Sequence, residues 1–84
     1  MDYEALIKAV CTNLVQDSES LIIREMSLEE EKRRLFVIMA DESDVARLIG
    51  KGGKIIRSIR EIANLAAKLH SEYVDIQVEN FANN

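Results

Sequence analysis

The fold of this 84-residue chain is decided by one stretch, Leu48-Ile49-Gly50-Lys51-Gly52-Gly53-Lys54-Ile55-Ile56-Arg57. All three glycines of the protein lie in it, and the chain has no proline. Glycine adopts backbone conformations that other residues avoid, so the backbone has its greatest freedom here. The stretch is typical of a short helix that ends, a Gly-x-x-Gly turn over residues 50–53, and a longer helix that begins.

Apolar spacing predicts the helices on both sides of this turn. The first is expected over residues 43–49, with Ser43 or Asp44 as its N-cap. Its expected buried side is formed by Val45, Leu48 and Ile49. The second is expected over residues 54–70, with Ile56 at the border of its buried stripe. That stripe is predicted to contain Ile55, Ile59, Ile62, Ala63, Ala66 and Leu69.

The rest of the chain predicts one more helix and three strands. Residues 2–16 carry apolar side chains at helical spacing after a candidate N-cap, Asp2. Residues 21–28 and 33–40 are predicted to be strands joined by a polar turn, and residues 73–79 alternate as a half-buried strand does. We expect residues 81–84 to fray.

The resulting order, α-β-β-α-α-β, predicts an α+β fold in which three helices cover one face of a three-stranded sheet. The length allows one domain, expected to span residues 1–84. The single cysteine excludes an internal disulfide, and no apolar run approaches the length of a membrane span. The acidic start of the chain shows no secretory signal, so we expect a cytoplasmic protein without a membrane partner.

The charge distribution is uneven. The whole chain has 11 basic and 15 acidic residues, a net charge of −4, which argues against a general binder of polyanions. However, the segment from Val45 to Arg60 contains five basic residues and no acid, so the remainder of the chain has a balance of −9. The five are Arg47, Lys51, Lys54, Arg57 and Arg60. A nucleic acid is therefore expected to bind only at this segment.

The turn has the chemistry of a phosphate site. Backbone N–H groups and a helix N-terminus favour an anion, and glycine lets a sugar–phosphate backbone come close. Lys51 and Lys54 can pair with phosphates there. The turn is not a Walker A loop, because no Gly-x-x-x-x-Gly-Lys-Ser/Thr pattern is present. No acid–base pair, nucleophile or metal-ligand set lies near it, so we expect neither an enzyme nor a cofactor.

The segment Ile49–Ile56 between two helices resembles the signature of the KH domain, a module that binds single-stranded nucleic acids. Only 14 residues follow His70, which leaves room for one strand and favours the type II, prokaryotic arrangement. Within that class the chain resembles the stand-alone bacterial KH proteins of the KhpA (YlqC) family. Met1–Lys8 and Asp44–Lys51 carry this second resemblance.

The resemblance implies a cytoplasmic RNA-binding homodimer, an RNA chaperone or post-transcriptional regulator that also pairs with a KhpB (Jag)-like protein and is tied to cell shape. It implies a clamp that holds about four nucleotides. The clamp residues are Gly50, Lys51, Gly52 and Gly53, with Lys54, Arg47 and Arg57 beside them. Ile49, Ile56 and Ile38 of strand 33–40 are expected to form an aliphatic groove under the bases.

Two questions stay open at this stage. The nucleic acid could be single-stranded RNA or single-stranded DNA. The protein could also be a protein–protein adaptor that uses the loop region to dimerise, with RNA binding secondary. Strand 33–40 is apolar on both faces, so its second face is a further candidate dimer contact.

Overall fold

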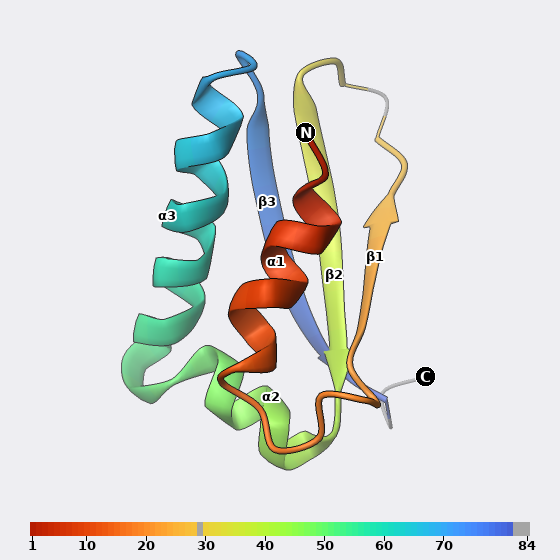
Figure 1. Ribbon diagram of the computed structural model, residues 1–84, viewed down its shortest axis with the longest axis vertical. Coiled ribbons are helices and arrows are strands. Elements are labelled where there is room, and N and C mark those ends of the chain that lie inside the picture. Colours follow the sequence, from red (N-terminus) through yellow and green to blue (C-terminus); the bar gives the residue numbers. More distant parts are fainter. Residues whose placement is uncertain (29, 82–84) are drawn as a thin grey trace.

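A computed structural model describes residues 1–28 and 30–81 (Figure 1). The elements are, in chain order, α1 (Tyr3–Thr12), β1 (Ile22–Met26), β2 (Arg33–Ala40), α2 (Glu42–Ile49), a single 3₁₀ turn (Lys51–Gly53), α3 (Lys54–Lys68) and β3 (Tyr73–Asn80). The α+β class and the order α-β-β-α-α-β of a type II KH domain are thus confirmed. Of the residues 81–84 that are predicted to fray, 82–84 lie outside the described residues.

The sheet has the strand order β1-β2-β3, in which β2 is antiparallel to β1 and parallel to β3. A short hairpin can join the antiparallel pair, whereas the parallel pair needs a crossover, which α2 and α3 supply. The helices lie over one face of the sheet (Figure 1). The hairpin turn lies at one end of the molecule, and α2 with the glycine turn lies at the other (Figure 1).

The core lies between the helices and the sheet. α1 contributes Tyr3, Ile7 and Cys11, each almost completely buried, and the helix begins as predicted, with the Asp2 carboxylate accepting a hydrogen bond from the Ala5 N–H at 3.0 Å. The central strand contributes Phe36 and Ile38, and β3 contributes side chains on alternate residues. The predicted alternation of β3 is confirmed: Val74 and Ile76 are fully buried, and Val78 is half-buried.

α1 ends at Thr12, four residues earlier than predicted, and β1 is shorter than the predicted 21–28. The reason for the first difference is Asp44. Its carboxylate accepts hydrogen bonds from the Gln16 N–H at 2.9 Å and the Asp17 N–H at 3.1 Å, so these amides do not continue the helix. Asp44 is therefore buried and does not cap α2, whose N-cap is Asp41.

The buried stripe of α3 is rotated from the predicted one. Ile56, Ile59, Ala63 and Ala67 face the core, whereas Ile62 and Leu69, predicted to be buried, are 40% and 84% exposed. Alanines at two of the buried positions let the helix backbone lie close to the sheet, a preference that apolar spacing alone does not reveal. Ile49, expected on the buried side of α2, is also exposed.

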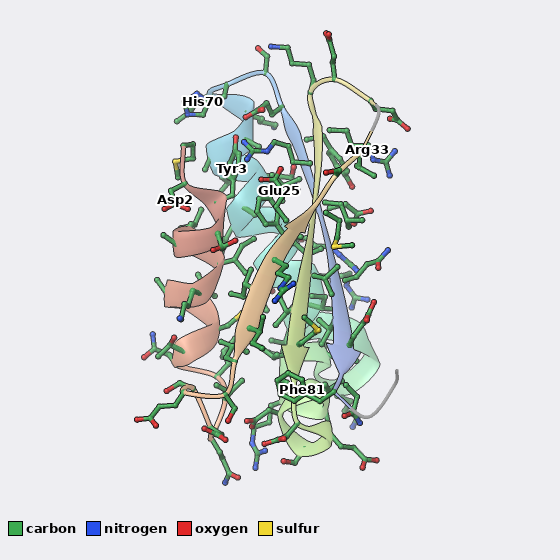
Figure 2. All side chains as sticks on the ribbon, turned by 90° about the vertical axis from the view of Figure 1, so that its right-hand side faces the viewer. Asp2, Tyr3, Glu25, Arg33, His70 and Phe81 are labelled. Carbon is green, nitrogen blue, oxygen red and sulfur yellow. The ribbon has the colours of Figure 1, made fainter. Side chains whose placement is uncertain are left out.

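Arg34 stabilises the hairpin end of the molecule through contacts with several elements. Its guanidinium donates two hydrogen bonds to the Glu25 carboxylate, at 2.6 and 2.7 Å, and lies 5.0 Å from the centre of the Tyr3 ring. The Tyr3 hydroxyl donates to Glu72 at 2.7 Å, and Tyr3 and Glu25 lie near the same end in Figure 2. These contacts join α1, β1, β2 and the segment before β3.

None of the described helices is long and apolar enough to cross a bilayer.

Candidate nucleic-acid interface

The backbone conformation of the turn over residues 50–53 favours glycine. All three of its glycines have positive φ angles. At Gly50 a side chain has no room, because a Cβ there would lie 2.4 Å from Ile55 Cγ1 and 3.0 Å from the Ile55 nitrogen. At Gly52 a Cβ would meet nothing within 4 Å, so only the φ of 63° favours glycine. Gly50 determines the shape of the turn, and Gly52 leaves its outer side open.

Some amides of the turn are unpaired. The Gly53 N–H donates to the Gly50 carbonyl at 3.1 Å, and the Lys54 N–H donates to the Lys51 carbonyl. The N–H groups of Lys51 and Gly52 have no backbone partner within residues 1–28 and 30–81. No described side chain caps the start of α3. Free amides beside an uncapped helix start favour an anion.

The five basic side chains differ in what they already bind. The side chains of Lys51 and Lys54 are exposed and make no hydrogen bond or ion pair with the described part of the chain. Arg47 pairs with Asp44 at 3.2 Å, and Arg57 donates to the Gly52 carbonyl at 2.9 Å. Arg60 donates two hydrogen bonds to the Ile76 carbonyl, at 2.7 and 3.1 Å. Two lysines are thus uncommitted, while the three arginines also hold the structure.

A groove runs beside the turn, between the helices and β3. The residues that line it are Ile49, Ile56, Arg60, Gln77, Val78 and Glu79. Ile49 is 38% exposed and Ile56 is 7% exposed, so the first offers its side chain and the second forms the floor. Ile38, predicted to line the groove, is fully buried and supports the sheet from within the core. The opposite wall comes from β3 because β3, not β2, is the strand at this edge.

The free edge of β3 is partly covered by α3. The Tyr73 N–H donates to the Lys32 carbonyl in the loop before β2, and the Phe81 N–H donates to the Ala40 carbonyl of β2. In the parallel pairing, the N–H and C=O groups of odd-numbered β3 residues therefore face β2, and those of even-numbered residues face outward. Asn64 satisfies both the N–H and the C=O of Val74, each at 2.8 Å, and Arg60 takes the Ile76 carbonyl.

The next outward residue, Val78, lies in the groove. Neither its N–H nor its C=O has a hydrogen-bond partner among the described residues. The apolar groove therefore carries one free donor and one free acceptor on its β3 wall. Sequence reasoning missed this feature, although the alternation of residues 73–79 already placed Val78 on the helix side of the strand.

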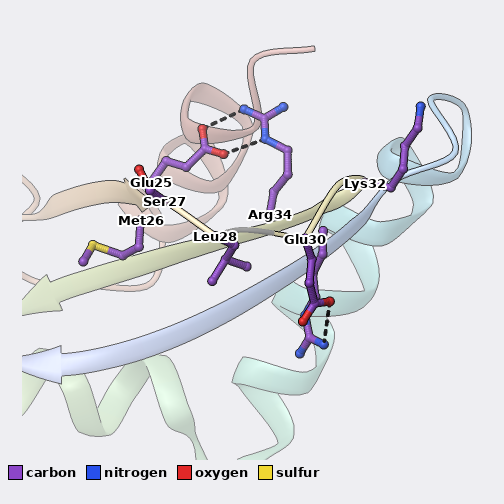
Figure 3. Close-up of a pocket in the computed structure, with 8 residues that line it drawn as sticks. Glu25, Met26, Ser27, Leu28, Glu30, Lys32 and Arg34 are labelled. Atoms are coloured by element: carbon purple, nitrogen blue, oxygen red, sulfur yellow. Dashed lines mark hydrogen bonds and ion pairs between the residues drawn. The ribbon is translucent and has the colours of Figure 1, made fainter.

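A second hollow lies at the hairpin end, between β1, β2 and the turn that joins them (Figure 3). It also has basic residues, but Arg34 is bound to Glu25, and Arg33 lies 3.7 Å from Glu30 and 3.6 Å from Asp75. The hydrogen bonds from Arg34 lower the pKa of Glu25, and the same contacts raise the pKa of Arg34. The charges of both arginines are thus paired within the protein, whereas Lys32, which also lines the hollow, is exposed and has no ion pair with the described residues.

The remaining perturbed groups are buried. Burial raises the pKa of Cys11 to about 11, and burial together with the hydrogen bond to Glu72 raises the pKa of Tyr3 to about 12. Hydrogen bonds from Gln16 and Asp17 lower the pKa of Asp44. Across residues 1–28 and 30–81, no cluster of three or more His, Cys, Asp or Glu side chains is placed to hold a metal ion.

Comparison with known proteins agrees with the geometry. The family model described as KhpA/KhpB, KH domain, matches residues 4–78. The RNA-binding protein KhpA of Oceanobacillus iheyensis is 32% identical over 59 residues, which cover 70% of this chain and 76% of the relative. The RNA-binding protein KhpA of Thermotoga maritima is 29% identical over 55 residues, 66% of this chain and 71% of the relative. No solved structure matches the chain.

Proposed function

Because this chain belongs to the KhpA/KhpB family of KH domains, we propose that it binds short single-stranded RNA at the Gly50–Gly53 turn and the groove beside it. The family is one of RNA-binding domains and not of enzymes. The observation that carries the proposal is the coincidence, at one end of the molecule, of an apolar groove with two lysine side chains and two amides that have no partner among residues 1–28 and 30–81.

The turn holds the phosphates in this proposal. Lys51 and Lys54 supply charge without losing an internal contact, since neither pairs with the described part of the chain. The free amides of Lys51 and Gly52 add donors at the same place. Arg57 stabilises the turn, because its hydrogen bond to the Gly52 carbonyl holds the backbone that carries these amides.

The groove holds the bases. Ile49, Ile56 and Val78 offer apolar surface to base faces, and none of the residues that line the groove is aromatic. The N–H and C=O of Val78 form a donor–acceptor pair on a strand edge, which suits the polar edge of a base. A base can present that edge only when it is unpaired, so we propose single strands of about four nucleotides as the ligand. Single-stranded DNA is the comparison ligand.

The acidic remainder of the chain limits the length of RNA that binds. Outside Val45–Arg60 the balance is −9, and Glu79 stands at the end of the groove. A long polyanion would meet repulsion beyond the turn. With two to four phosphate contacts, the logarithm of the binding constant should fall with the logarithm of salt concentration with a slope of roughly −1.4 to −2.8.

The wider role is proposed from the family resemblance. We place the protein in the cytoplasm as an RNA chaperone or post-transcriptional regulator, acting as a homodimer or with a KhpB/Jag-like protein. The alternative, an adaptor that dimerises through the loop region, has less support. The two most exposed large apolar side chains, Leu69 and Leu65, lie at the C-cap of α3 and in its last turns, away from the glycine turn.

The test is a charge reversal with a matched control. The variant K51E/K54E removes the two uncommitted charges, and K8E/R24E makes the same change in net charge on α1 and β1. For an RNA of about six nucleotides, slightly longer than the clamp, we expect the first variant to bind at least about tenfold more weakly. The second should bind as the wild type does. Equal losses in both variants would show that only net charge matters and would refute the site.

A further inference from the structure

β1 (Ile22–Met26) leaves one edge of the sheet open. It is the outermost strand on the side away from β3, and it lies toward the viewer in Figure 2. Four of its five residues are exposed. All five pair with β2 in an unbroken register, without a bulge, and the chain has no proline that would block this edge. An unblocked strand edge is a template on which another strand can pair.

The pairing shows which backbone groups of β1 are free. The even-numbered residues of β2 bond to β3, so its odd-numbered residues bond to β1. In the antiparallel register, those odd-numbered residues lie opposite the even-numbered residues of β1. The N–H and C=O groups of Ile23 and Glu25 therefore point away from the sheet, and none of them has a hydrogen-bond partner among residues 1–28 and 30–81. β1 thus offers two donors and two acceptors along one line.

Apolar side chains lie beside this edge on the sheet face that the helices leave uncovered. Ile22 and Met26 are 38% and 47% exposed, and each lies opposite a half-buried apolar residue of β2. Val37 of β2 also belongs to this face, because it is not part of the core between the helices and the sheet. Arg24, between Ile22 and Met26 on the same face, is exposed and its side chain has no hydrogen bond or ion pair with the described residues. The row along the free edge therefore reads apolar, basic, apolar.

A second copy of the chain does not suit this edge. If two β1 strands paired over all five residues about a two-fold axis, Arg24 would lie directly opposite the partner's Arg24. Residues at such a position are not joined by backbone hydrogen bonds, and their Cα atoms are only about 4.5 Å apart. Like charges directly opposite each other are destabilising. The strand that fits places a carboxylate opposite Arg24 and an apolar side chain on either side of it.

We propose that β1 binds an extended segment of another protein as a fourth strand of the sheet, antiparallel to β1. Three successive side chains of that segment on the open face are apolar, acidic and apolar. The acidic side chain lies opposite Arg24, and the apolar ones cover Ile22 and Met26. The backbone of the segment bonds to Ile23 and Glu25, so main-chain hydrogen bonds supply affinity and the three side chains supply specificity.

The RNA groove lies at the opposite edge of the sheet. The strand order is β1-β2-β3, and the groove has its wall on β3. The proposed partner and the RNA therefore do not compete for the same residues, and one protein molecule can hold both. The inference goes beyond the proposed function and does not depend on RNA binding.

The first test uses a synthetic peptide of roughly strand length, Ser-Val-Thr-Asp-Thr-Val-Ser, with blocked ends. Its two valines and its aspartate share one face, and lysine replaces the aspartate in the matched control peptide. Calorimetric titration of the full chain should give binding of the aspartate peptide in the millimolar range or tighter, and binding of the lysine peptide at least about fivefold weaker. R24E, a change at an exposed side chain, should reverse this preference. Equal binding of the two peptides by the wild type, or no binding of either, would overturn the proposal.

The second test concerns the backbone. In the antiparallel arrangement the two threonines exchange hydrogen bonds with Ile23 and Glu25, whereas the N–H groups of the valines point away from β1. N-methylation of both threonines should abolish binding, and N-methylation of both valines should leave it unchanged. The reverse pattern would contradict the antiparallel arrangement.

Hydrogen exchange provides the matching measurement on the protein. In the free chain the amides of Ile23 and Glu25 should exchange faster than the Arg24 amide, which faces β2. The aspartate peptide should slow the exchange of Ile23 and Glu25 and leave that of Arg24 unchanged. Unaltered exchange at Ile23 and Glu25 with the peptide bound would show that it does not add as a strand.

This proposal and the proposed function can fail separately. K51E/K54E should keep the aspartate peptide and lose the RNA. R24E should bind an RNA of about six nucleotides as the wild type does, while its peptide preference is reversed. Loss of the peptide in K51E/K54E, with retention in R24E, would place the peptide at the turn and overturn the assignment to β1.

Discussion

The hairpin end and the turn end of the molecule both carry basic side chains, but they use them differently. At the hairpin end, Arg34 binds Glu25 through two hydrogen bonds and lies over the Tyr3 ring. At the turn end, Lys51 and Lys54 have no partner in the described part of the chain. A cation whose charge is already neutralised holds the fold together. A cation without a partner can bind a ligand. Lys32 of the hairpin end also has no ion pair with the described residues, but Lys51 and Lys54 lie beside unpaired amides and an apolar groove.

The difference also explains why a net charge of −4 is compatible with a nucleic-acid partner. Acidic residues at the hairpin end neutralise the arginines there, whereas Val45–Arg60 contains no acid. Local balance, rather than total charge, decides where a polyanion can approach. The comparison predicts that substitutions of Arg34 will mainly lower stability, and that substitutions of Lys51 and Lys54 will mainly lower RNA affinity.

The largest effect is expected within the turn itself. G50A introduces a Cβ 2.4 Å from Ile55 Cγ1 at a φ of 74°, so it should lower the free energy of unfolding by about 2–4 kcal/mol. G52A meets no atom within 4 Å and should cost about 1 kcal/mol, from its backbone conformation alone. Urea unfolding measures both. Equal losses would mean that crowding at Gly50 is relieved elsewhere and that the turn is not rigid.

A smaller loss of stability, with no loss of binding, is expected at the hairpin end. R34A removes the paired hydrogen bonds to Glu25 and the contact with the Tyr3 ring, so it should cost about 1–2 kcal/mol. R34K keeps the charge but not the two-pronged geometry, so its free energy of unfolding should lie between those of R34A and the wild type. Calorimetry gives the melting temperatures. A marked fall in RNA affinity for folded R34A would remove the distinction between the two ends.

The smallest effect is expected in the pH dependence of stability. The lowered pKa of Asp44 means that the folded protein binds fewer protons at this site than the unfolded chain does. Its contribution is present above the ordinary aspartate pKa of about 3.9 and is lost as the pH falls through the folded value. D44N should therefore be less stable at neutral pH, with a shallower acid decline that converges on the wild-type curve. Parallel curves would show that Asp44 does not contribute to acid unfolding.

The sequence predicted the local features and missed those that depend on strand pairing. The glycines, the helices around them and the alternation of β3 are local patterns, and each predicted its element. The β3 wall of the groove depends on the parallel pairing of β2 with β3, which brings Val78 beside Ile49 and Ile56. Ile38, predicted to line the groove, lies fully buried in the central strand. A strand that is apolar on both faces does not show from its sequence which strand lies beside it.

Two other misses come from tertiary contacts that override local preference. Asp44 has the residue type of a helix cap, but the amides of Gln16 and Asp17 bind its carboxylate. The stripe of α3 that faces the sheet contains alanines, which leaves Ile62, Leu65 and Leu69 outside. Helical spacing gives the period of an apolar pattern, but not which of two stripes is buried.

The most direct test of the contrast between the two ends is an amide-shift titration of the wild-type protein with a short single-stranded RNA. We predict that the shifted amides cluster at residues 47–60 and at Gln77–Glu79, with the Val78 amide among the most affected. Amides near Glu25, Arg34 and Glu72 should stay unchanged. Shifts centred on the hairpin end, or an unmoved Lys51–Lys54 segment in the presence of bound RNA, would contradict the account.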